Sequence, residues 1–455
     1  MSFEVYRELF ITYTQWLLFL LLNVLYTSVR NISWILNGTY WRLIRNQRPE
    51  NYEQCAHVMQ IVYKHQLDQF IEPRISDFML VHDRFEHPNY VLRDDVTLLT
   101  ITDSRAIFLQ SRKDAAPPFR HNFFVIGQWE GADKIITIPL NQFQTLAEST
   151  RRDDAQIVFL QNQSRCGGTL LTNVFLETGR CVTFNEPGAI NALSKYIFID
   201  KIWDGAETRR LFRNTVHMLC KPYRGLDGPV LAYVIKPTVT SIPCMSVIQE
   251  SLPDAVQLFL YRRPVEVATS LRRLGQVIPT LKLVYYFPRL PGVVAPLLRI
   301  IGHTDVQMRG WTPRCHSDLE IGYRIASMSM YYYLKCRREG VSVTGIRYSD
   351  LVAHRDAIIR QIFERCHLTT ELVAEAVKAL DRDSQERTDF SQKRLKEACP
   401  NPPKVTTAFL EAARDMAKEF DVPGPEGWDP GFRLPGSIEP KAGPKAEEGE
   451  ANCAP

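Results

Sequence analysis

A strand, a polar loop and a helix follow one another between residues 157 and 179, and this succession constrains the fold more than any other stretch. Ile157–Gln161 is a short apolar run typical of a buried strand, and Leu170–Thr178 is an apolar-periodic segment typical of a helix. The loop between them, Asn162–Thr169, holds two adjacent glycines and the cationic Arg165. Glycines let backbone N–H groups approach an anion closely, and the helix start points further N–H groups at it. The stretch therefore predicts a site for a phosphate or sulfate ester.

Length and composition set wider bounds. At 455 residues the chain exceeds the usual size of a single core, so we expect two folded units with tails. Hydrophobic residues make up 45% of the chain and charged residues 23%, as in globular proteins. A net charge of +4 is too small to indicate a nucleic-acid partner. The ten cysteines form no Cys-x-x-Cys pair, which predicts buried thiols rather than a disulfide or zinc framework, and we expect no metal.

The N-terminal segment, residues 1–48, is predicted to contain a hydrophobic helix. Phe10–Val29 carries no charged residue and, at about 1.5 Å per residue, is long enough to cross a bilayer core of about 30 Å. Polar residues interrupt the segment, so an apolar helix packed on a soluble body is the alternative. Arginines follow at positions 30, 42, 45 and 48, which favours the cytosolic face for the body if the helix spans. We therefore keep two expectations, a membrane-associated protein and a cytoplasmic one.

Residues 49–150 are predicted to form a small accessory α+β region. It opens with a helical stretch around Tyr52–Phe70. Short β-rich runs then predict an antiparallel sheet: Tyr90–Leu92, Val96–Ile101, Ala106–Leu109 and Lys134–Ile138. Histidines and acids before Pro88 lack the spacing of a known metal motif and are predicted to be solvated turn residues: His82, Asp83, Glu86 and His87.

Strand-like and helical runs alternate over residues 151–433, which predicts an α/β domain with a P-loop-type parallel sheet and flanking helices. The five candidate strands are Ile157–Gln161, Cys181–Phe184, Val230–Ile235, Val256–Tyr261 and Val341–Ile346. A polar or charged group follows each strand, and ligands bind outside the carboxyl ends of strands in such sheets. We therefore expect five groups to converge on one crevice: Arg165, Glu186, Lys236, Arg262 and Arg347.

The glycine-bearing loop does not fit the nucleoside-triphosphatase pattern, because that pattern requires a lysine where Thr169 stands. Ser164–Leu171 instead resembles the 5′-phosphosulfate loop of sulfotransferases that use 3′-phosphoadenosine-5′-phosphosulfate (PAPS), commonly Pro-Arg-Ser-Gly-Thr-Thr-Leu-Leu. Ser164, Cys166 and Gly168 depart from that pattern. The resemblance implies that the loop holds the 5′-phosphosulfate of PAPS through Arg165, Cys166, Gly167, Gly168, Thr169 and Leu170.

Two further segments resemble the same family. Leu260–Ser270 is similar to its 3′-phosphate segment, with Arg262 at a strand end and Ser270 about two helical turns further on. The resemblance implies that both residues bind the 3′-phosphate. Asn185–Leu193 is similar to the Glu-Pro segment of bacterial-type members, which implies that Glu186 is the general base. A carboxylate that is merely stabilised by a helix N-terminus is the alternative for Glu186.

The resemblance covers about residues 155–400 and implies a PAPS-dependent sulfotransferase. The implied reaction moves a sulfuryl group from PAPS to a hydroxyl or amine acceptor, without a metal. Lys236 would neutralise the transferring group, or merely extend from a strand end, and Ser384 would contact the nucleotide. By the same resemblance, the Golgi is a further expected location.

Two rival classes stay open. A nucleotide kinase would need the loop lysine and an acid that holds Mg²⁺, but Arg262 stands at the end of the fourth strand. A non-catalytic nucleotide-binding or scaffold protein is the second rival, because Cys166 and Gly168 replace hydroxyl residues that contact the donor in the family. Two stretches depart from an enzyme core: Leu281–Ile301 is an apolar insertion, and residues 434–455 have a composition that predicts disorder.

Overall fold

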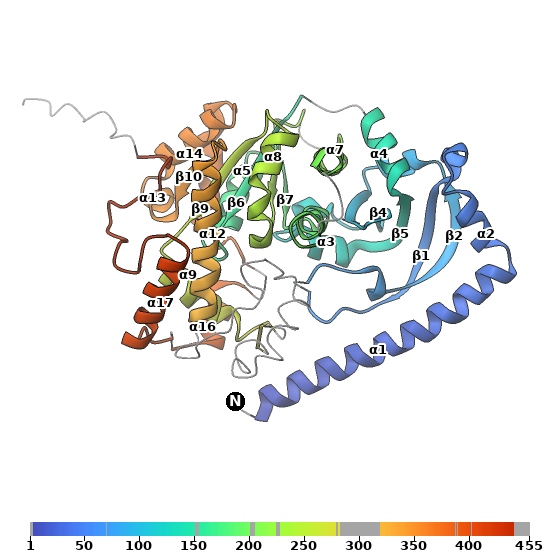
Figure 1. Ribbon diagram of the computed structural model, residues 1–455, viewed down its shortest axis with the longest axis horizontal. Helices are drawn as coiled ribbons and strands as arrows, with labels where there is room; N and C mark the ends of the chain where they lie inside the picture. The colour runs from blue at the N-terminus through green and yellow to red at the C-terminus, as the bar shows by residue number, and fades with distance from the viewer. Residues whose placement is uncertain are drawn as a thin grey trace, which may run out of the picture.

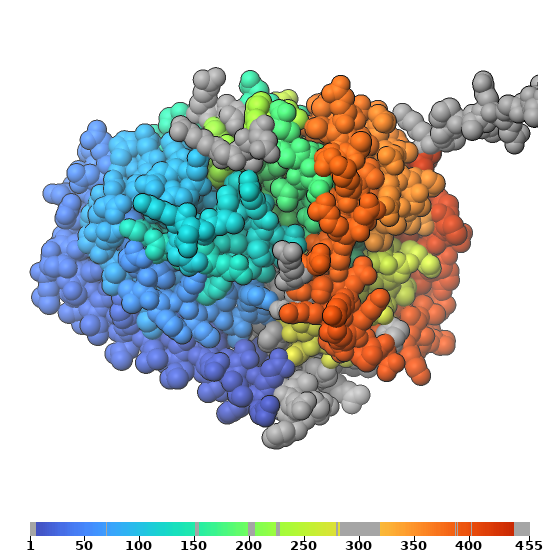
Figure 2. Space-filling view, turned by 180° about the vertical axis from the view of Figure 1, so that it is seen from behind, coloured from blue at the N-terminus to red at the C-terminus, as the bar shows by residue number. Residues whose placement is uncertain are grey.

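The computed structural model describes residues 3–69, 71–150, 154–200, 205–223, 228–278, 281–282, 319–386, 388, 390–401 and 403–440. It contains two five-stranded sheets with helices around them (Figure 1), which confirms the predicted α/β class. Seen from behind, the N-terminal residues in blue and the C-terminal residues in orange and red lie on opposite sides of the molecule (Figure 2). From residue 283 onward the predicted apolar insertion lies outside the described residues, as does the predicted tail from residue 441.

The C-terminal half is built on a parallel sheet. Its strands are hydrogen-bonded in the order β10-β9-β6-β8-β7. The chain thus places β8 and β7 on one side of the central β6, and β9 and β10 on the other. A ligand crevice is expected beyond the carboxyl end of such a central strand. The five predicted strands are confirmed, with later starts for β8 and β10: β6 (Gln156–Asn162), β7 (Cys181–Asn185), β8 (Ala232–Lys236), β9 (Val256–Tyr261) and β10 (Thr344–Arg347).

Helices cover both faces of the parallel sheet, and β6 shows how the sequence produces this. Val158 and Leu160 pack against α5 (Gly168–Glu177) and α14 (Arg355–Arg365) on one face. Phe159 points to the other face, toward α7 (Gly205–Leu219). A strand buried on both faces reads as a continuous apolar run, which is the pattern that predicted it. Within the described part of the chain, the other α-helices around this sheet are α6 (Gly188–Lys195), α8 (Met245–Ser251), α9 (Pro264–Leu274), α12 (Glu320–Arg338), α13 (Tyr348–Ala353), α15 (Val373–Ala376), α16 (Gln392–Ala398) and α17 (Thr407–Glu419).

The N-terminal half is built on an antiparallel sheet with the strand order β2-β1-β5-β4-β3. Three of its strands contain runs predicted from the sequence: β3 (Val96–Ile101), β4 (Arg105–Ser111) and β5 (Ala132–Pro139). The other two strands, β1 (Ala56–Lys64) and β2 (Phe78–Glu86), were not predicted. Two helices accompany the sheet, α3 (Phe124–Gly131) and α4 (Leu140–Ser149).

Three predictions in this half are wrong. The helix expected over Tyr52–Phe70 is replaced largely by β1, whose first residues are all buried, and periodicity does not separate a fully buried strand from a helix. The run Tyr90–Leu92 lies in a 3₁₀ helix, η3 (Pro88–Leu92), rather than in a strand. His82 is on β2 instead of in a turn, and its Nδ1 lies 3.0 Å from Nε2 of His57.

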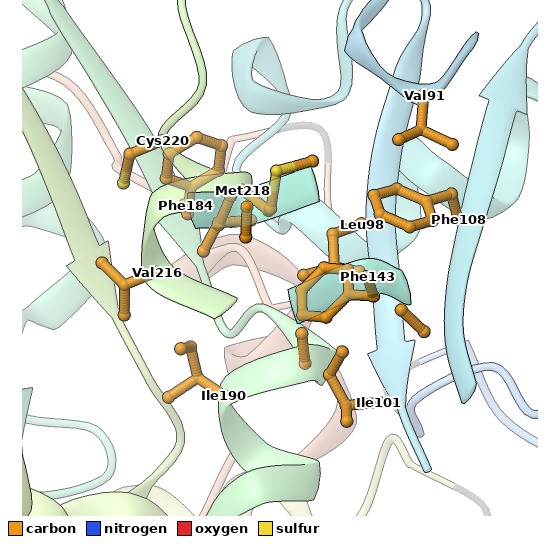
Figure 3. Packing of buried hydrophobic residues seen from close by; sticks show 14 of the residues in the cluster. Val91, Leu98, Ile101, Phe108, Phe143, Phe184, Ile190, Val216, Met218 and Cys220 are labelled. Carbon is orange, nitrogen blue, oxygen red and sulfur yellow. The ribbon is translucent and has the colours of Figure 1, made fainter. Parts of the chain in front are cut away.

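One hydrophobic cluster joins the two sheets (Figure 3). Leu98 and Phe108 reach it from the antiparallel sheet, and Phe184 and Val216 reach it from the parallel sheet and its helix α7. The two halves therefore share a core, and the division into folding units near residue 150 stays a prediction.

The helix α1 (Phe3–Leu36) runs beside β2 along one side of the antiparallel sheet, and the short α2 (Thr39–Arg45) follows it (Figure 1). Asn23 Nδ2 donates to the carbonyl of Ser76 at 2.6 Å and fastens the middle of α1 to the loop before β2. Among the described residues, the segment Tyr6–Leu36 is the one helix long and apolar enough to cross a membrane by length and composition. That test leaves the location of the protein undetermined.

The start of the predicted tail is packed against the body. Leu434 and Ile438 are buried, and Ser437 pairs with Gly345 of β10. The backbone N–H of Leu434 donates to the hydroxyl of Tyr261 at 2.9 Å. The disorder expected from residue 434 therefore does not extend to residues 434–440.

Candidate active site

A cavity of about 1310 Å³ opens beyond the carboxyl ends of the parallel strands. Of the residues that the sequence places in this crevice, all except Cys166 and Arg347 line it: Arg165, Gly167, Gly168, Thr169, Leu170, Glu186, Lys236, Arg262, Ser270 and Ser384. The expected convergence of Arg347 is wrong. This residue is buried at the edge strand β10, and its guanidinium donates to the backbone carbonyls of Asp429 and Pro430 in the C-terminal segment.

The loop between β6 and α5 has the backbone shape of an anion cradle. Gly167 has a φ of 95°, a left-handed conformation that favours glycine. A Cβ at this position would lie 2.6 Å from the ring of Tyr348, so the close approach also requires glycine. At Gly168 a Cβ would lie 2.9 Å from Cε of Lys236. The departure from the family pattern at Gly168 thus has a physical reason, since glycine makes room for the lysine stem.

Cys166 turns away from the cavity. Its side chain is fully buried in the core beneath the loop, with Sγ 3.2 Å from the carbonyl oxygen of Leu260. Burial raises the pKa of the thiol to about 12, so it stays protonated and is no nucleophile near neutral pH. Because the side chain is buried, the predicted contact of Cys166 with the 5′-phosphosulfate would have to come from its backbone N–H.

Arg165 is held between two segments that are distant in the sequence. Its Nε donates to Oγ of Ser270 at 3.1 Å, and its Nη1 donates to Oε1 of Gln385 at 3.0 Å. Burial lowers the pKa of Arg165 to about 10, and the positive charge of Arg262 acts in the same direction. The guanidinium stays protonated at neutral pH. A bound anion close to both arginines would raise the pKa of Arg165 again, against the effects of burial and of the neighbouring charge.

Arg262 enters the cavity from the end of β9. Its backbone N–H donates to Oε1 of Gln163 at 2.7 Å, and its guanidinium lies 4.9 Å from the ring centre of Tyr348. Nε donates to Oε2 of Glu266 one helical turn further on, at 2.5 Å. A phosphate bound here would compete with Glu266 for this guanidinium.

Glu186 and Lys236 form an ion pair at the ends of β7 and β8. The distance from Lys236 Nζ to Glu186 Oε1 is 2.7 Å, and the lysine side chain is 3% exposed against 33% for the glutamate. Glu186 has a φ of 60°, and its backbone N–H donates to the carbonyl of Lys236 at 2.6 Å. A left-handed conformation costs a non-glycine residue about 1–3 kcal/mol, and such strain is concentrated at functional sites.

A second carboxyl group reaches the cavity from the antiparallel half. Glu72, in the segment between β1 and β2, accepts a hydrogen bond from Nδ2 of Asn191 on α6. The orientation of that amide is fixed, because its Oδ1 accepts from the backbone N–H of Thr238 at 3.1 Å and from the hydroxyl of Ser241 at 3.1 Å. Burial raises the pKa of Glu72 to about 7, with the Asn191 bond acting against this and Glu186 adding to it.

Sequence reasoning missed Glu72, and it carried over Gln385 only as part of the Ser384-Gln385 pair that resembles the family. Glu72 stands in no motif and lies far from Glu186 along the chain, so only the packing of the two sheets brings it in. Gln385 does follow Ser384 in the segment that resembles the family, and its side chain rather than that of Ser384 contacts Arg165. Among the residues that the structure describes, no group of three or more His, Cys, Asp or Glu side chains is placed to hold a metal ion.

The cavity therefore brings cations and carboxyl groups together. Arg165 and Arg262, with the loop amides, suit a phosphate or sulfate group. Glu186 and Glu72 supply carboxyl groups that can take or give a proton within the same cavity. Together these groups can bind an anionic donor and accept a proton from a second molecule.

Comparisons with known proteins give a structural likeness at low similarity. No family model and no curated protein matches the chain. A sulfotransferase from Alicyclobacillus acidocaldarius aligns with 60% of this chain and 98% of its own, at 13% identity and a TM-score of 0.29. A sulfotransferase from Mycobacterium tuberculosis aligns with 56% of this chain and 78% of its own, at 13% identity and a TM-score of 0.30. Because both similarities are low, the case for a function rests on the geometry of the cavity.

Proposed function

We propose that the chain is a sulfotransferase that moves the sulfuryl group of PAPS to a hydroxyl or amine acceptor, with Glu186 as general base. One observation carries the proposal: Arg165 and Arg262, from the ends of two neighbouring strands, line one cavity together with the Lys236–Glu186 ion pair. Cations gathered in this way suit a ligand with two separate anionic groups, and PAPS has a 5′-phosphosulfate and a 3′-phosphate.

The donor roles follow from the positions of these groups. The loop amides from Gly167 onward, together with Arg165, would bind the 5′-phosphosulfate at the start of α5. Arg262 and Ser270 would bind the 3′-phosphate, and Ser384 would contact the nucleotide. The hydrogen bond between Arg165 and Ser270, at 3.1 Å, supports a continuous donor site rather than two separate ones.

The acceptor step requires a proton acceptor and a cation. As the acceptor oxygen or nitrogen forms its bond to sulfur, the bond from sulfur to the bridging 5′-phosphate oxygen breaks and the electron pair stays on that oxygen. Lys236 and Arg165 would stabilise this charge. Oε1 of Glu186 accepts from Lys236, which leaves Oε2 to take the acceptor proton.

Two of the three departures from the family pattern, Cys166 and Gly168, are compatible with this donor. The side chain of Cys166 is in the core, so the loop loses a hydroxyl but gains no competing group in the cavity. Gly168 leaves space for Lys236, which takes up part of the volume that a threonine would fill. The alternative is a non-catalytic nucleotide-binding or scaffold protein, which would bind the nucleotide in the same site without transferring a group.

The test is a pair of measurements on the full chain. Titration calorimetry should give much tighter binding of 3′,5′-adenosine bisphosphate than of 5′-AMP, and equal binding of the two would overturn the proposal. Labelled PAPS offered with a panel of hydroxyl and amine acceptors should then give labelled product. Tight nucleotide binding without any transfer would favour the scaffold instead.

A further inference from the structure

α1 exposes many apolar side chains that a surface helix of a soluble protein would bury. Such a helix buries its apolar stripe and exposes its polar residues. In α1 the outer face carries exposed large apolar side chains along its whole length: Phe10, Ile11, Leu17, Leu18, Leu21, Leu22, Val24, Leu25, Val29, Ile32, Ile35 and Leu36. Leu21, Val24 and Leu25 in the middle of the helix are 69%, 68% and 63% exposed.

Some polar groups of α1 turn toward the body, beside the buried apolar side chains of Leu9, Phe19 and Trp34. Asn23 is buried and donates to the carbonyl of Ser76, and Tyr26 and Arg30 both donate to the carbonyl of Leu80 on β2. Arg30 is the one charged residue between Phe10 and Leu36. In the same stretch, five polar residues of α1 are exposed as well: Thr14, Gln15, Ser28, Asn31 and Ser33. The exposed surface of α1 is thus mainly apolar with some polar groups, a mixture suited to the boundary between hydrocarbon and water.

The body of the protein contacts α1 near both of its ends. Near the N-terminal end, Glu8 pairs with Lys282 at 2.7 Å, and near the other end the ring of Trp34 packs on His57 at 5.3 Å. If α1 crossed a bilayer, it would draw the polar edge of the antiparallel sheet into the hydrocarbon with it. That cost excludes a spanning helix in this packed state.

We propose that α1 lies in the plane of a membrane interface, with its outer face in the hydrocarbon boundary and the body of the protein on one side of the bilayer. The 31 residues of the apolar segment extend over about 46 Å, a length suited to lying along a surface. The next helix supports the same placement. Trp41 on α2 is 62% exposed, and the exposed Arg42 and Arg45 stand beside it, a combination suited to an anionic lipid headgroup region.

Vesicle flotation of the full chain tests the membrane contact. Wild-type protein should float with vesicles of phosphatidylcholine and phosphatidylserine. The double variant Leu21→Glu/Leu25→Glu should lose about a hundredfold in apparent affinity, because each leucine withdrawn from the apolar boundary costs about tenfold. Val352→Glu is the matched control: Val352 is 40% exposed on α13, far from α1, and should leave flotation unchanged.

Both glutamates of the double variant stand on the outer face, so thermal melting in detergent should match the wild type. Absence of flotation by the wild type would overturn the proposal. So would a soluble wild-type dimer that the double variant converts to monomer, since the outer face would then be an interface between two copies of the chain.

Topology separates a helix that lies on the membrane from one that spans it. Epitope tags placed at the N-terminus and at the C-terminus should both be accessible from the outside of sealed vesicles to which the protein has been added. Protection of the N-terminal tag alone would mean that α1 crosses the bilayer, and it would overturn the proposal.

Discussion

Replacing Glu186 by glutamine tests the proposed base and the ion pair together. The carboxylate makes a charge-assisted bond of 2.7 Å to Lys236, and such bonds contribute about 1.5–3 kcal/mol to stability. Because Glu186 is 33% exposed, we expect Glu186→Gln to lower the free energy of unfolding by the lower value, about 1.5 kcal/mol. Turnover should fall far more, by about 10² to 10⁴, which is the usual contribution of general acid–base catalysis.

A double-mutant cycle with Lys236→Met separates these two effects. Glu186→Gln leaves the ammonium of Lys236, 3% exposed, without its carboxylate, whereas the double variant contains neither charge. The stability losses should therefore be less than additive by about 0.5–3 kcal/mol. Turnover should not recover in the double variant, because the base is still absent.

Chemical denaturation gives the free energies, and transfer from labelled PAPS gives the rates. Undiminished turnover in Glu186→Gln would remove Glu186 from the mechanism, even if the stability cycle behaved as expected. Turnover restored by Lys236→Met in the double variant would show that Glu186 acts only by neutralising the lysine.

Three further predictions concern other parts of the cavity. Arg262→Ala should lose at least about tenfold in affinity for 3′,5′-adenosine bisphosphate and little for 5′-AMP, measured by calorimetry, and equal losses would contradict a 3′-phosphate contact. Gly167→Ala should lower the free energy of unfolding by about 1–3 kcal/mol and abolish nucleotide binding, because residue 167 has a φ of 95° and its Cβ would meet the ring of Tyr348. Gly340→Ala is the control: its φ of 83° strains the backbone in the same way, but its Cβ would point into open space, so nucleotide binding should be kept. Burial raises the pKa of Glu72 from its usual 4.5 to about 7, so the native state holds this proton more tightly than the unfolded chain does. Stability from this group is complete below the unfolded pKa of 4.5 and is lost as pH rises through 7. Melting from about pH 4 to pH 8 should show a wild-type loss of about 3 kcal/mol that Glu72→Gln lacks, and parallel curves would refute this.

The local part of the site could be predicted from sequence, because each piece is a short pattern in one stretch of chain. An apolar run, a glycine-bearing loop and a periodic helix specify β6, its loop and α5 without reference to the rest of the molecule. The same holds for Arg262 at the end of β9. Convergence of four strand-end groups followed from the parallel sheet, since carboxyl ends of parallel strands share one edge.

Other features depended on contacts between distant segments. Cys166 was expected to contact the donor from the loop, but its side chain is buried in the core. Arg347 also ends a strand, yet its guanidinium lies outside the cavity because it donates to the carbonyls of Asp429 and Pro430 in the C-terminal segment. β1 was mistaken for a helix because its first four residues are all buried, which removes the alternation that identifies a strand over that stretch.

Sequence by itself thus determined the local shapes and the apolar character of the N-terminal segment, because hydrophobic periodicity and glycine positions act over a few residues. The tertiary structure alone decided which face of α1 is left outward, because that depends on where β2 lies. It also decided that Glu72 enters the cavity and that the two sheets share one core. Such features require the packing of surfaces that no single stretch of sequence contains.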